Sequence, residues 1–379
     1  MDKITVNLGK ERSYPILVGC GNLGEVGEHT ARLKQNVSGV FIVSSPRIYG
    51  LYGEPVAKSF KKAGFRHVGT GLFPDGERNK SLNSYSRVIA KLVEFASRSY
   101  GANGRGGIII ANLGGGVVGD LGGFVAATFN RGDSSARVDY IQIPTTLLGF
   151  VDCGVGGKVG VNFPRGKAVV KNLLGQFYQP RLVYADLDVL KTLPRRELKS
   201  GLAEVIKYGI IKDKLLFGYL EKHHRDILSL EPGALRHIVK KSYNIKARVV
   251  EQDEKDRKGI RAILNYGHTV GHAIEGANLH YKHGEAIAVG MVCAAEIARE
   301  LGIFPQEGIK RIEELIKAVR LPVRAKDCRL SDILELLKRD KKVVNGVNRY
   351  VLPTEIGRVI VKQGVDNGII RRVVRKRLE

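Results

Sequence analysis

The chain has 379 residues, more than one hydrophobic core usually fills, so we expect two domains. Its 43% hydrophobic and 26% charged residues are ordinary for a soluble globular enzyme, and no apolar run reaches membrane-spanning length, which argues against disordered and membrane proteins. The net charge of +24 is spread along the chain without a nucleic-acid-binding motif, so we expect attraction of an anionic small molecule rather than specific nucleic-acid binding.

The beginning of the chain and its cysteines indicate a cellular compartment. Met1 to Val6 has the pattern of a strand and lacks the basic and apolar segments of a signal peptide. Four cysteines are widely spaced and form no CxxC pair: Cys20, Cys153, Cys293 and Cys328. Neither a disulfide framework nor a thiolate metal site is therefore expected, and a reducing cytoplasm fits best.

Residues 1–188 alternate short β-branched runs with helical patterns, which is typical of an α/β domain with a Rossmann-like parallel sheet. The predicted strands are Gly39–Val43, Gly107–Ala111, Tyr140–Pro144 and Leu182–Ala185. This first domain is the expected nucleotide-binding domain.

Residues 189–379 have mainly helical periodicity and form the expected second domain. The predicted helices are Arg195–Lys212, Gly233–Glu251, Lys258–Gly276, Gly284–Leu301 and Gly308–Val319. A strand pair follows around Asn348–Leu352 and Arg358–Val361. Because no linker separates the halves, we expect an active site in a cleft between the α/β and the helical domain.

A glycine-rich turn follows the predicted strand at Gly107. Its residues Gly114–Asp120 match G-x-G-x-x-G in the strand-turn-helix context of a dinucleotide site, where glycines and a helix start approach a pyrophosphate. Asp139 lies before its strand rather than at its end, so this is not an ordinary first Rossmann turn. A purely structural turn is the alternative.

Four polar residues share one face of a predicted helix in the second domain. From Arg261, the residues Asn265, His268 and His272 follow at offsets of 4, 7 and 11. The opposite face is apolar and is expected to pack inward: Ala262, Ile263, Tyr266, Val270 and Ile274. A solvated face would normally carry Lys and Glu, so this polar stripe indicates a functional site.

This domain offers a set of histidines and a carboxylate that is typical of a catalytic zinc site: His268, His272, His283 and Glu204. Such a site needs three protein ligands and an open position. Glu204 and Lys207 are three apart on a helix, although an ordinary ion pair would have the same spacing. His283 lies beyond the stripe. Helical spacing alone favours His268 with His272 as paired ligands, but it does not decide the set.

Together these segments resemble the 3-dehydroquinate synthases, a family of sugar phosphate cyclases in the fold group that includes glycerol dehydrogenase. The resemblance spans nearly the whole chain. Its carriers are Pro74–Glu77 with Lys80, Gly114–Asp120, Ile143–Leu147, Asp152–Lys158, Ser200–Lys207, Arg261–His272, Lys282–Glu285 and Asp340–Lys342.

The resemblance implies a phosphate lyase that converts 3-deoxy-D-arabino-heptulosonate 7-phosphate to 3-dehydroquinate in the shikimate pathway of aromatic amino acid biosynthesis. It implies recycled NAD+, one divalent metal ion (Zn2+ or Co2+), and a homodimer. The family's reaction joins transient oxidation, phosphate elimination, reduction and aldol cyclisation. The alternatives are a cyclase for sedoheptulose 7-phosphate, a polyol dehydrogenase, or a basic binding protein on the same scaffold.

The resemblance also implies roles for individual residues. The metal ligands are Glu204, His268 and His283, so His272 becomes a substrate-hydroxyl partner and proton relay beside the metal. The other catalytic residues are Lys158, Asp152, Asn265 and Arg261. The substrate-binding residues are Lys207, Lys246, Asn172, Arg131, and Lys341 or Lys342. The cofactor contacts are Glu77, Lys80, Gly114, Gly115, Gly116, Asp120, Thr145, Thr146 and Lys158.

Two loops are longer than the family pattern. Residues 133–137 follow Asn130–Gly132, so the family arginine, which in relatives can reach the neighbouring subunit's substrate phosphate, is Arg131 or Arg137. Either Lys167 or Lys171 takes the family lysine position before Asn172. Short insertions in loops are usually tolerated, so we expect altered loops in an active enzyme.

Overall fold

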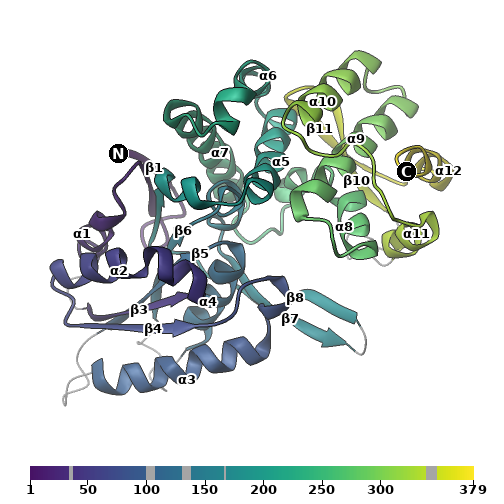
Figure 1. The fold of residues 1–379 in the computed structure, drawn as a ribbon. Coiled ribbons are helices and arrows are strands. Elements are labelled where there is room, and N and C mark those ends of the chain that lie inside the picture. The colour runs from purple at the N-terminus through teal and green to yellow at the C-terminus, as the bar shows by residue number, and fades with distance from the viewer. Residues whose placement is uncertain (34–36, 100–106, 130–137, 166–167, 339–347) are drawn as a thin grey trace. The chain divides into compact units, whose positions relative to one another are not determined.

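The computed structural model describes residues 1–33, 37–99, 107–129, 138–165, 168–338 and 348–379 (Figure 1). The chain divides into two compact units. The first consists of Met1–Leu193 with Lys246–Glu251, and the second of Pro194–Ile245 with Gln252–Glu379. In the described part of the chain, no helix combines the length and apolar character that crossing a membrane requires.

A seven-stranded sheet forms the centre of the first unit, in the order β1-β2-β9-β6-β5-β3-β4. Its strands are β1 (Asp2–Val6), β2 (Tyr14–Gly19), β3 (Val37–Ser44), β4 (His67–Leu72), β5 (Gly107–Gly114), β6 (Asp139–Pro144) and β9 (Leu182–Asp186). Only the β1–β2 pair is antiparallel among these described strands. Every residue of β6 and β9 is buried, as expected for strands covered on both faces. The predicted parallel-sheet domain and its four strands are confirmed.

Helices connect and cover these strands. They are α1 (Val26–Ala31), α2 (Pro46–Lys62), α3 (Leu82–Ser99) and α4 (Gly116–Thr128), with short helical turns η1 (Leu23–Glu25), η2 (Glu77–Asn79), η3 (Gly149–Cys153) and η4 (Leu187–Thr192). On one side of the sheet, Leu92 of α3 and Leu121 of α4 join a buried cluster with Phe41 and Ile110. Burying this apolar surface fixes α3 and α4 on the strands.

Glycines let α4 lie close to the sheet. A β-carbon at Gly122 would fall 1.9 Å from Oδ1 of Asn112 on β5, and one at Gly123 would fall 2.3 Å from the Val159 side chain. Larger residues at these two positions would push the helix outward. The close packing places the first turn of α4 directly at the end of β5.

A separate antiparallel hairpin consists of β7 (Lys158–Arg165) and β8 (Ala168–Phe177), with Lys158 opposite Phe177 (Figure 1). It packs against α4 through Val159 and Val161, which are buried. We did not predict this hairpin from the sequence. It nevertheless carries both Lys158 and Asn172, which were predicted to serve the active site.

The second unit is mainly helical, as predicted. Its helices are α5 (Arg195–Ile211), α6 (Lys214–Leu228), α7 (Pro232–Gln252, whose residues 246–251 belong to the first unit), η5 (Ile260–Asn265), α8 (His268–Ala277), α9 (His283–Glu300), α10 (Gln306–Ala318), α11 (Leu330–Lys338) and α12 (Asn367–Lys376). The strands β10 (Arg349–Glu355) and β11 (Arg358–Gln363) form the predicted antiparallel pair. Helix α9 is buried from Ala286 to Ala298 and packs against α5 and α8. It is therefore the central helix of this unit.

The segment Arg261–His272 is not the single helix that its polar spacing predicted. It forms the 3-10 helix η5, then a turn, and then α8, which begins at His268. The break occurs at Gly267, where φ is +75° and a β-carbon would fall 2.6 Å from the Met291 side chain on α9. Contact with α9 therefore overrides the helical periodicity.

The break also changes which side chains of the segment are buried. Tyr266, Val270 and Ile274 are buried as predicted, whereas Ala262 and Ile263 are partly exposed. Arg261 is itself buried, with 4% of its surface exposed. The predicted apolar side of the segment was therefore correct from Tyr266 onward but not for Ala262 and Ile263.

Candidate metal and nucleotide sites

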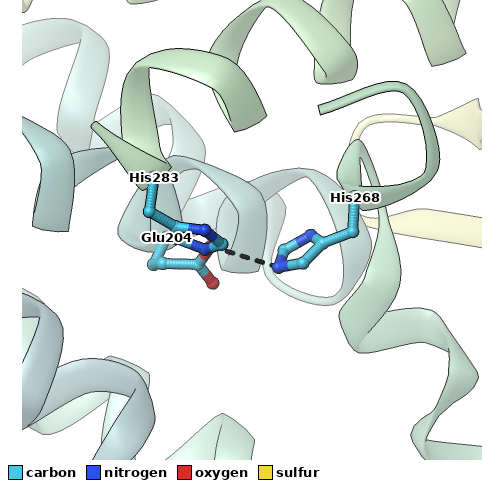
Figure 2. A group of neighbouring side chains, drawn as sticks. All are labelled: Glu204, His268 and His283. Carbon is cyan, nitrogen blue, oxygen red and sulfur yellow. Dashed lines mark ion pairs between the residues drawn. The ribbon is translucent and has the colours of Figure 1, made fainter. Parts of the chain in front are cut away.

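Glu204, His268 and His283 lie together in the second unit, each on a different helix (Figure 2). Glu204 is in the middle of α5, while His268 and His283 are the first residues of α8 and α9. Oε1 of Glu204 is 3.6 Å from Nε2 of His268 and 3.5 Å from Nε2 of His283. Two imidazoles and a carboxylate thus converge on one point.

The contact between α5 and α9 brings His283 to Glu204. The backbone N–H of Gly284 donates to the Ser200 hydroxyl at 2.9 Å. A β-carbon at Gly284 would fall 2.0 Å from the Ser200 carbonyl oxygen, so only glycine allows this approach. Arg196 of α5 adds two hydrogen bonds of 2.7 Å to the carboxylate of Glu285, beside His283.

Burial and charge make Glu204 the electrostatic centre of this cluster. Its side chain is completely buried and forms an ion pair with Lys207, one turn along α5. Burial opposes its charged form, but the Lys207 ammonium and the two imidazoles outweigh this effect and hold the pKa of Glu204 well below its usual range. Glu204 is therefore ionised at neutral pH.

The two histidines differ in their protonation. Burial, together with the Lys207 charge, lowers the pKa of His268, so its ring is neutral at pH 7. Burial acts in the same direction on His283, but interactions with Glu204 and Glu275 outweigh it and raise the pKa of His283 to about 9. The difference arises because His283 faces two carboxylates.

These residues have the chemistry of a metal site. Both oxygens of Glu204 are buried and, apart from the ion pairs with Lys207 and the two histidines, have no hydrogen-bond partner among the described residues. His268 lies with Nδ1 3.0 Å from the Tyr266 carbonyl, an arrangement that directs Nε2 toward Glu204. A carboxylate with two imidazoles suits zinc or cobalt and leaves a position open for substrate.

His272 lies beside this cluster. Its ring centroid is 5.1 Å from that of His268 and 5.9 Å from that of His283, and the side chain is exposed. The possible ligand atoms of His272, Glu275 and His283 lie within 4.8 Å of one another, whereas His272 is not part of the cluster around Glu204. The pair of ligands that helical spacing favoured, His268 with His272, is therefore not the pair that faces Glu204.

Asp253 organises the loop that leads to Arg261, a role that we did not identify in the sequence. This buried carboxylate accepts backbone hydrogen bonds from Arg257 at 2.8 Å, Lys258 at 3.1 Å and Ile260 at 3.1 Å. Burial raises the pKa of Asp253, but these N–H groups outweigh it, so the net shift is downward. Arg261 follows at once and donates to the Glu254 carbonyl at 2.9 Å. An acidic residue before a glycine-containing loop is too common a pattern for the sequence to have predicted this role of Asp253.

The predicted nucleotide turn lies at the end of β5 in the first unit. Gly115 is the N-cap of α4, and a β-carbon there would fall 3.1 Å from the Thr146 side chain. A β-carbon at Gly116 would fall 2.8 Å from the Cys153 sulfur. The three glycines Gly114, Gly115 and Gly116 line a small hollow with Gln142, Pro144 and Cys153. Their backbone is open to a ligand in a way that larger residues would prevent.

Thr145 also fits a polar ligand at this turn. Its backbone N–H donates to the Gly114 carbonyl at 3.1 Å. Its hydroxyl oxygen is buried and has no hydrogen-bond partner among the residues that the structure describes. A buried hydroxyl beside a partly exposed helix N-terminus suits the phosphates or ribose of a dinucleotide.

Three predicted cofactor contacts form a charged cluster next to this turn. Lys80, which is buried, lies 3.0 Å from Asp120 of α4 and 3.2 Å from Glu77 of η2. Burial lowers the pKa of Lys80, but the two carboxylates outweigh it and raise the pKa above its usual value. For the carboxyl group of Asp120, in contrast, burial raises the pKa, and the Lys80 charge offsets only part of that rise.

Asn162 on β7 connects this cluster to the hairpin. Its amide donates to Oε1 of Glu77 at 2.8 Å, while its side-chain oxygen accepts the backbone N–H of Asn172 at 2.9 Å. Asn172 adopts a left-handed conformation with φ of +51°. The sequence pointed to Asn172 but not to the residue that holds it.

The remaining predicted residues are placed as follows. Asp152 and Lys246 form an ion pair of 2.6 Å within the first unit, and Lys158 lies 5.9 Å from the Phe177 ring centroid. Asn265 ends η5 and is partly exposed. Five residues fall outside the described ranges: Arg131, Arg137, Lys167, Lys341 and Lys342.

Comparison with protein families gives a match over most of the chain. Residues 70–200 match the model described as 3-dehydroquinate synthase N-terminal, and residues 201–343 match that described as 3-dehydroquinate synthase C-terminal. A 3-dehydroquinate synthase from Pelotomaculum thermopropionicum is 46% identical over 369 residues, covering 96% of this chain and 94% of that protein.

Solved structures of related cyclases have the same fold. A 2-deoxy-scyllo-inosose synthase complexed with carbaglucose-6-phosphate, NAD+ and Co2+ matches with a TM-score of 0.85 and 25% identity, covering 100% of both chains. A 2-epi-5-epi-valiolone synthase from Streptomyces hygroscopicus with bound NAD+ and Zn2+ matches with a TM-score of 0.82 and 26% identity, covering 98% of each chain. Since the closer sequence similarity is to the dehydroquinate synthases over nearly the full length, this chain belongs to the 3-dehydroquinate synthase family.

Proposed function

We propose that this chain converts 3-deoxy-D-arabino-heptulosonate 7-phosphate to 3-dehydroquinate and inorganic phosphate, as a phosphate lyase of the shikimate pathway. The observation that carries the proposal is the buried cluster of Glu204, His268 and His283. This cluster occurs in a chain that is 46% identical to a 3-dehydroquinate synthase along almost its whole length. Family membership and metal-site chemistry thus support the same reaction.

The proposed metal ion is Zn2+ or Co2+, held by Glu204, His268 and His283. Two related structures bind these ions, Co2+ in one and Zn2+ in the other. When bound, such an ion supplies Lewis acidity toward a substrate hydroxyl or ketone oxygen. Lys207 keeps Glu204 ionised, and Tyr266 orients the His268 ring, so both side chains are prepared to act as ligands.

The proposed cofactor is NAD+, bound at the glycine turn and the neighbouring charged cluster. Its contacts are Gly114, Gly115, Gly116, Thr145, Thr146, Glu77, Lys80, Asp120 and Lys158. When bound, NAD+ supplies a reversible hydride acceptor, so one molecule serves many turnovers without net NADH. Lys80 holds Asp120 and Glu77 in place, and the buried Thr145 hydroxyl offers a hydrogen bond to the nucleotide.

The proposed substrate ligands suit a molecule that carries both a carboxylate and a phosphate. Cationic side chains would compensate its charges: Lys158, Lys207, Lys246, Arg261, Arg131, and Lys341 or Lys342. Asn172, Asn265 and Asp152 would hold hydroxyl groups. His272, an exposed imidazole beside the metal cluster, would bind a hydroxyl and relay a proton.

We further propose that the enzyme is a cytoplasmic homodimer. The support for the compartment is that Cys20, Cys153, Cys293 and Cys328 are free thiols. The support for the dimer is the resemblance to relatives in which an arginine can reach the substrate phosphate of the neighbouring subunit. In this chain that arginine is Arg131 or Arg137. Sedimentation of the purified protein tests the dimer, and a monomer that remains fully active would contradict it.

Substrate selection is the sharpest test of this proposal, because the related structures belong to cyclases of other sugar phosphates. Purified protein with NAD+ and Zn2+ is incubated separately with the heptulosonate phosphate, sedoheptulose 7-phosphate and glucose 6-phosphate. We expect phosphate release and dehydroquinate formation only with the first. Turnover of sedoheptulose 7-phosphate instead would favour the alternative cyclase, and net NADH formation with glycerol would favour a polyol dehydrogenase.

A further inference from the structure

His283 presents both of its ring nitrogens to carboxylates. Its Nε2 is 3.5 Å from Oε1 of Glu204, and its Nδ1 is 3.6 Å from Oε2 of Glu275 on α8. An imidazole can bind a metal through one nitrogen while the other donates its proton to an acceptor. We propose that Glu275 is a positioning residue that accepts the Nδ1 proton of His283 and directs Nε2 toward the metal; this inference rests on the metal site of the proposed function.

The packing of α8 on α9 places Glu275 opposite the His283 ring. A β-carbon at Gly271 would fall 2.7 Å from the Ile287 side chain, and one at Gly290 would fall 2.0 Å from the Gly267 carbonyl oxygen. These glycines let the two helices touch along their backbones. Glu275 therefore reaches the first residue of α9 from a rigid helix rather than from a loop.

His268 has an arrangement of contacts similar to that of His283. Its Nδ1 lies 3.0 Å from the Tyr266 carbonyl, and its Nε2 faces Glu204. Each imidazole thus has one nitrogen next to a fixed oxygen and the other next to the shared carboxylate. For His283 that fixed oxygen belongs to Glu275, whose side chain is only 17% exposed and is therefore partly shielded from water. A charged acceptor also makes the imidazole a more basic ligand than a carbonyl does.

A different role for Glu275 makes a contrasting prediction. His272, Glu275 and His283 lie close enough to hold a cation of their own. As a ligand of a second ion, Glu275 would control the number of metal ions bound. As a positioning residue, it controls the affinity of one ion without changing the number.

The experiment measures Zn2+ binding directly, by competition with a chromogenic chelator, on metal-depleted wild-type protein and the Glu275→Gln and Glu275→Ala variants. We expect one Zn2+ per chain in all three, bound about 10- to 100-fold more weakly in the variants. Glu313→Gln is the matched control, because Glu313 is also partly buried, at 20% exposure, and pairs with Arg377 instead of a histidine. It should bind Zn2+ like the wild type. Thermal melting of each metal-free protein identifies any variant that fails to fold.

Each other result has a distinct meaning. Equal Zn2+ affinity in folded wild-type and both Glu275 variants would overturn the positioning role and leave the proposed function intact. A wild-type protein that binds two Zn2+ ions, and loses only the weaker one in Glu275→Gln, would also overturn it. A wild-type protein that binds no Zn2+ or Co2+ would overturn the proposed metal-dependent function itself.

Discussion

Glu204 and Lys207 show how one buried ion pair can prepare a metal site. The carboxylate is completely buried, and Lys207 is 2% exposed at its side chain, so each charge depends on the other. With metal, Glu204 has a second cation to stabilise it. A neutral side chain at residue 204 would remove a proposed metal ligand and leave the Lys207 ammonium buried without its counter-charge.

The Glu204→Gln substitution tests this interdependence. We expect metal affinity to fall by at least about 100-fold, since even partners outside the ligand set are worth 10- to 100-fold. We expect the metal-free protein to lose about 3–5 kcal/mol of unfolding free energy, because a buried charge loses its partner. Chelator competition and urea denaturation measure the two quantities. A Glu204→Gln, Lys207→Met double variant should recover stability but not metal binding; recovery of both would contradict the assigned ligand role.

The protonation of His283 gives metal binding a defined pH dependence. Its pKa is raised to about 9 in the metal-free protein from an ordinary value of 6.5, so the folded state binds the proton more tightly than the unfolded state. This contribution to stability is complete below about pH 6.5 and is lost as the pH rises through about 9. A metal ion that binds Nε2 of His283 must displace the proton on that nitrogen.

Calorimetric titration with Zn2+ in buffers of different ionisation enthalpy should therefore show about one proton released per ion at pH 7. His268 is already neutral there and should release none. Affinity should rise with pH by up to about tenfold per unit until the pH reaches about 9. Binding at pH 7 without proton release would contradict either the raised pKa of His283 or its role as a metal ligand.

The contacts of α9 with α5 and α8 explain what the sequence could and could not predict. The periodicity of α5, α7, α9 and α10 predicted helices close to those observed, because each has a continuous apolar face. The Arg261–His272 stripe failed as a single helix because Gly267 bends the chain where α9 crosses, and that contact is not local. The sequence placed His283 and Glu204 in one candidate ligand set with His268 and His272, but only the family resemblance chose His283 over His272, since no spacing relates residues from separate helices.

Gly284→Ala tests the importance of the α5–α9 contact. The added methyl group would lie 2.0 Å from the Ser200 carbonyl oxygen, so α9 must shift and carry His283 away from Glu204. We expect a loss of about 1–3 kcal/mol in unfolding free energy, together with weaker metal binding. Gly218→Ala on α6 is the control, because no described atom lies within 4 Å of its β-carbon position apart from its chain neighbours and the backbone of its own helix. It should be neutral or stabilise by up to about 1 kcal/mol; equal behaviour of both variants would contradict the packing argument.

The fold class of the entire chain could be predicted because α/β alternation and helical periodicity occupy different halves of the sequence. The two compact units of the structure, however, do not correspond to two continuous halves of the sequence. Residues Lys246–Glu251 lie in the middle of the helical half, yet they belong with the first unit, where Lys246 pairs with Asp152. A contact between residues 94 positions apart leaves no local pattern. The high net charge is consistent with attraction of a doubly anionic substrate.

In the proposed reaction, one enzyme with recycled NAD+ and one divalent metal ion per chain eliminates phosphate from the heptulosonate phosphate and closes the ring. The most direct measurement follows phosphate, dehydroquinate and NADH together, with limiting NAD+ and excess substrate. We expect phosphate and dehydroquinate in equal amounts, many molecules of each per NAD+, no net NADH, and loss of all turnover on metal removal with recovery on adding Zn2+ or Co2+. Turnover that persists without metal, NADH that accumulates with product, or the absence of phosphate release would contradict the account.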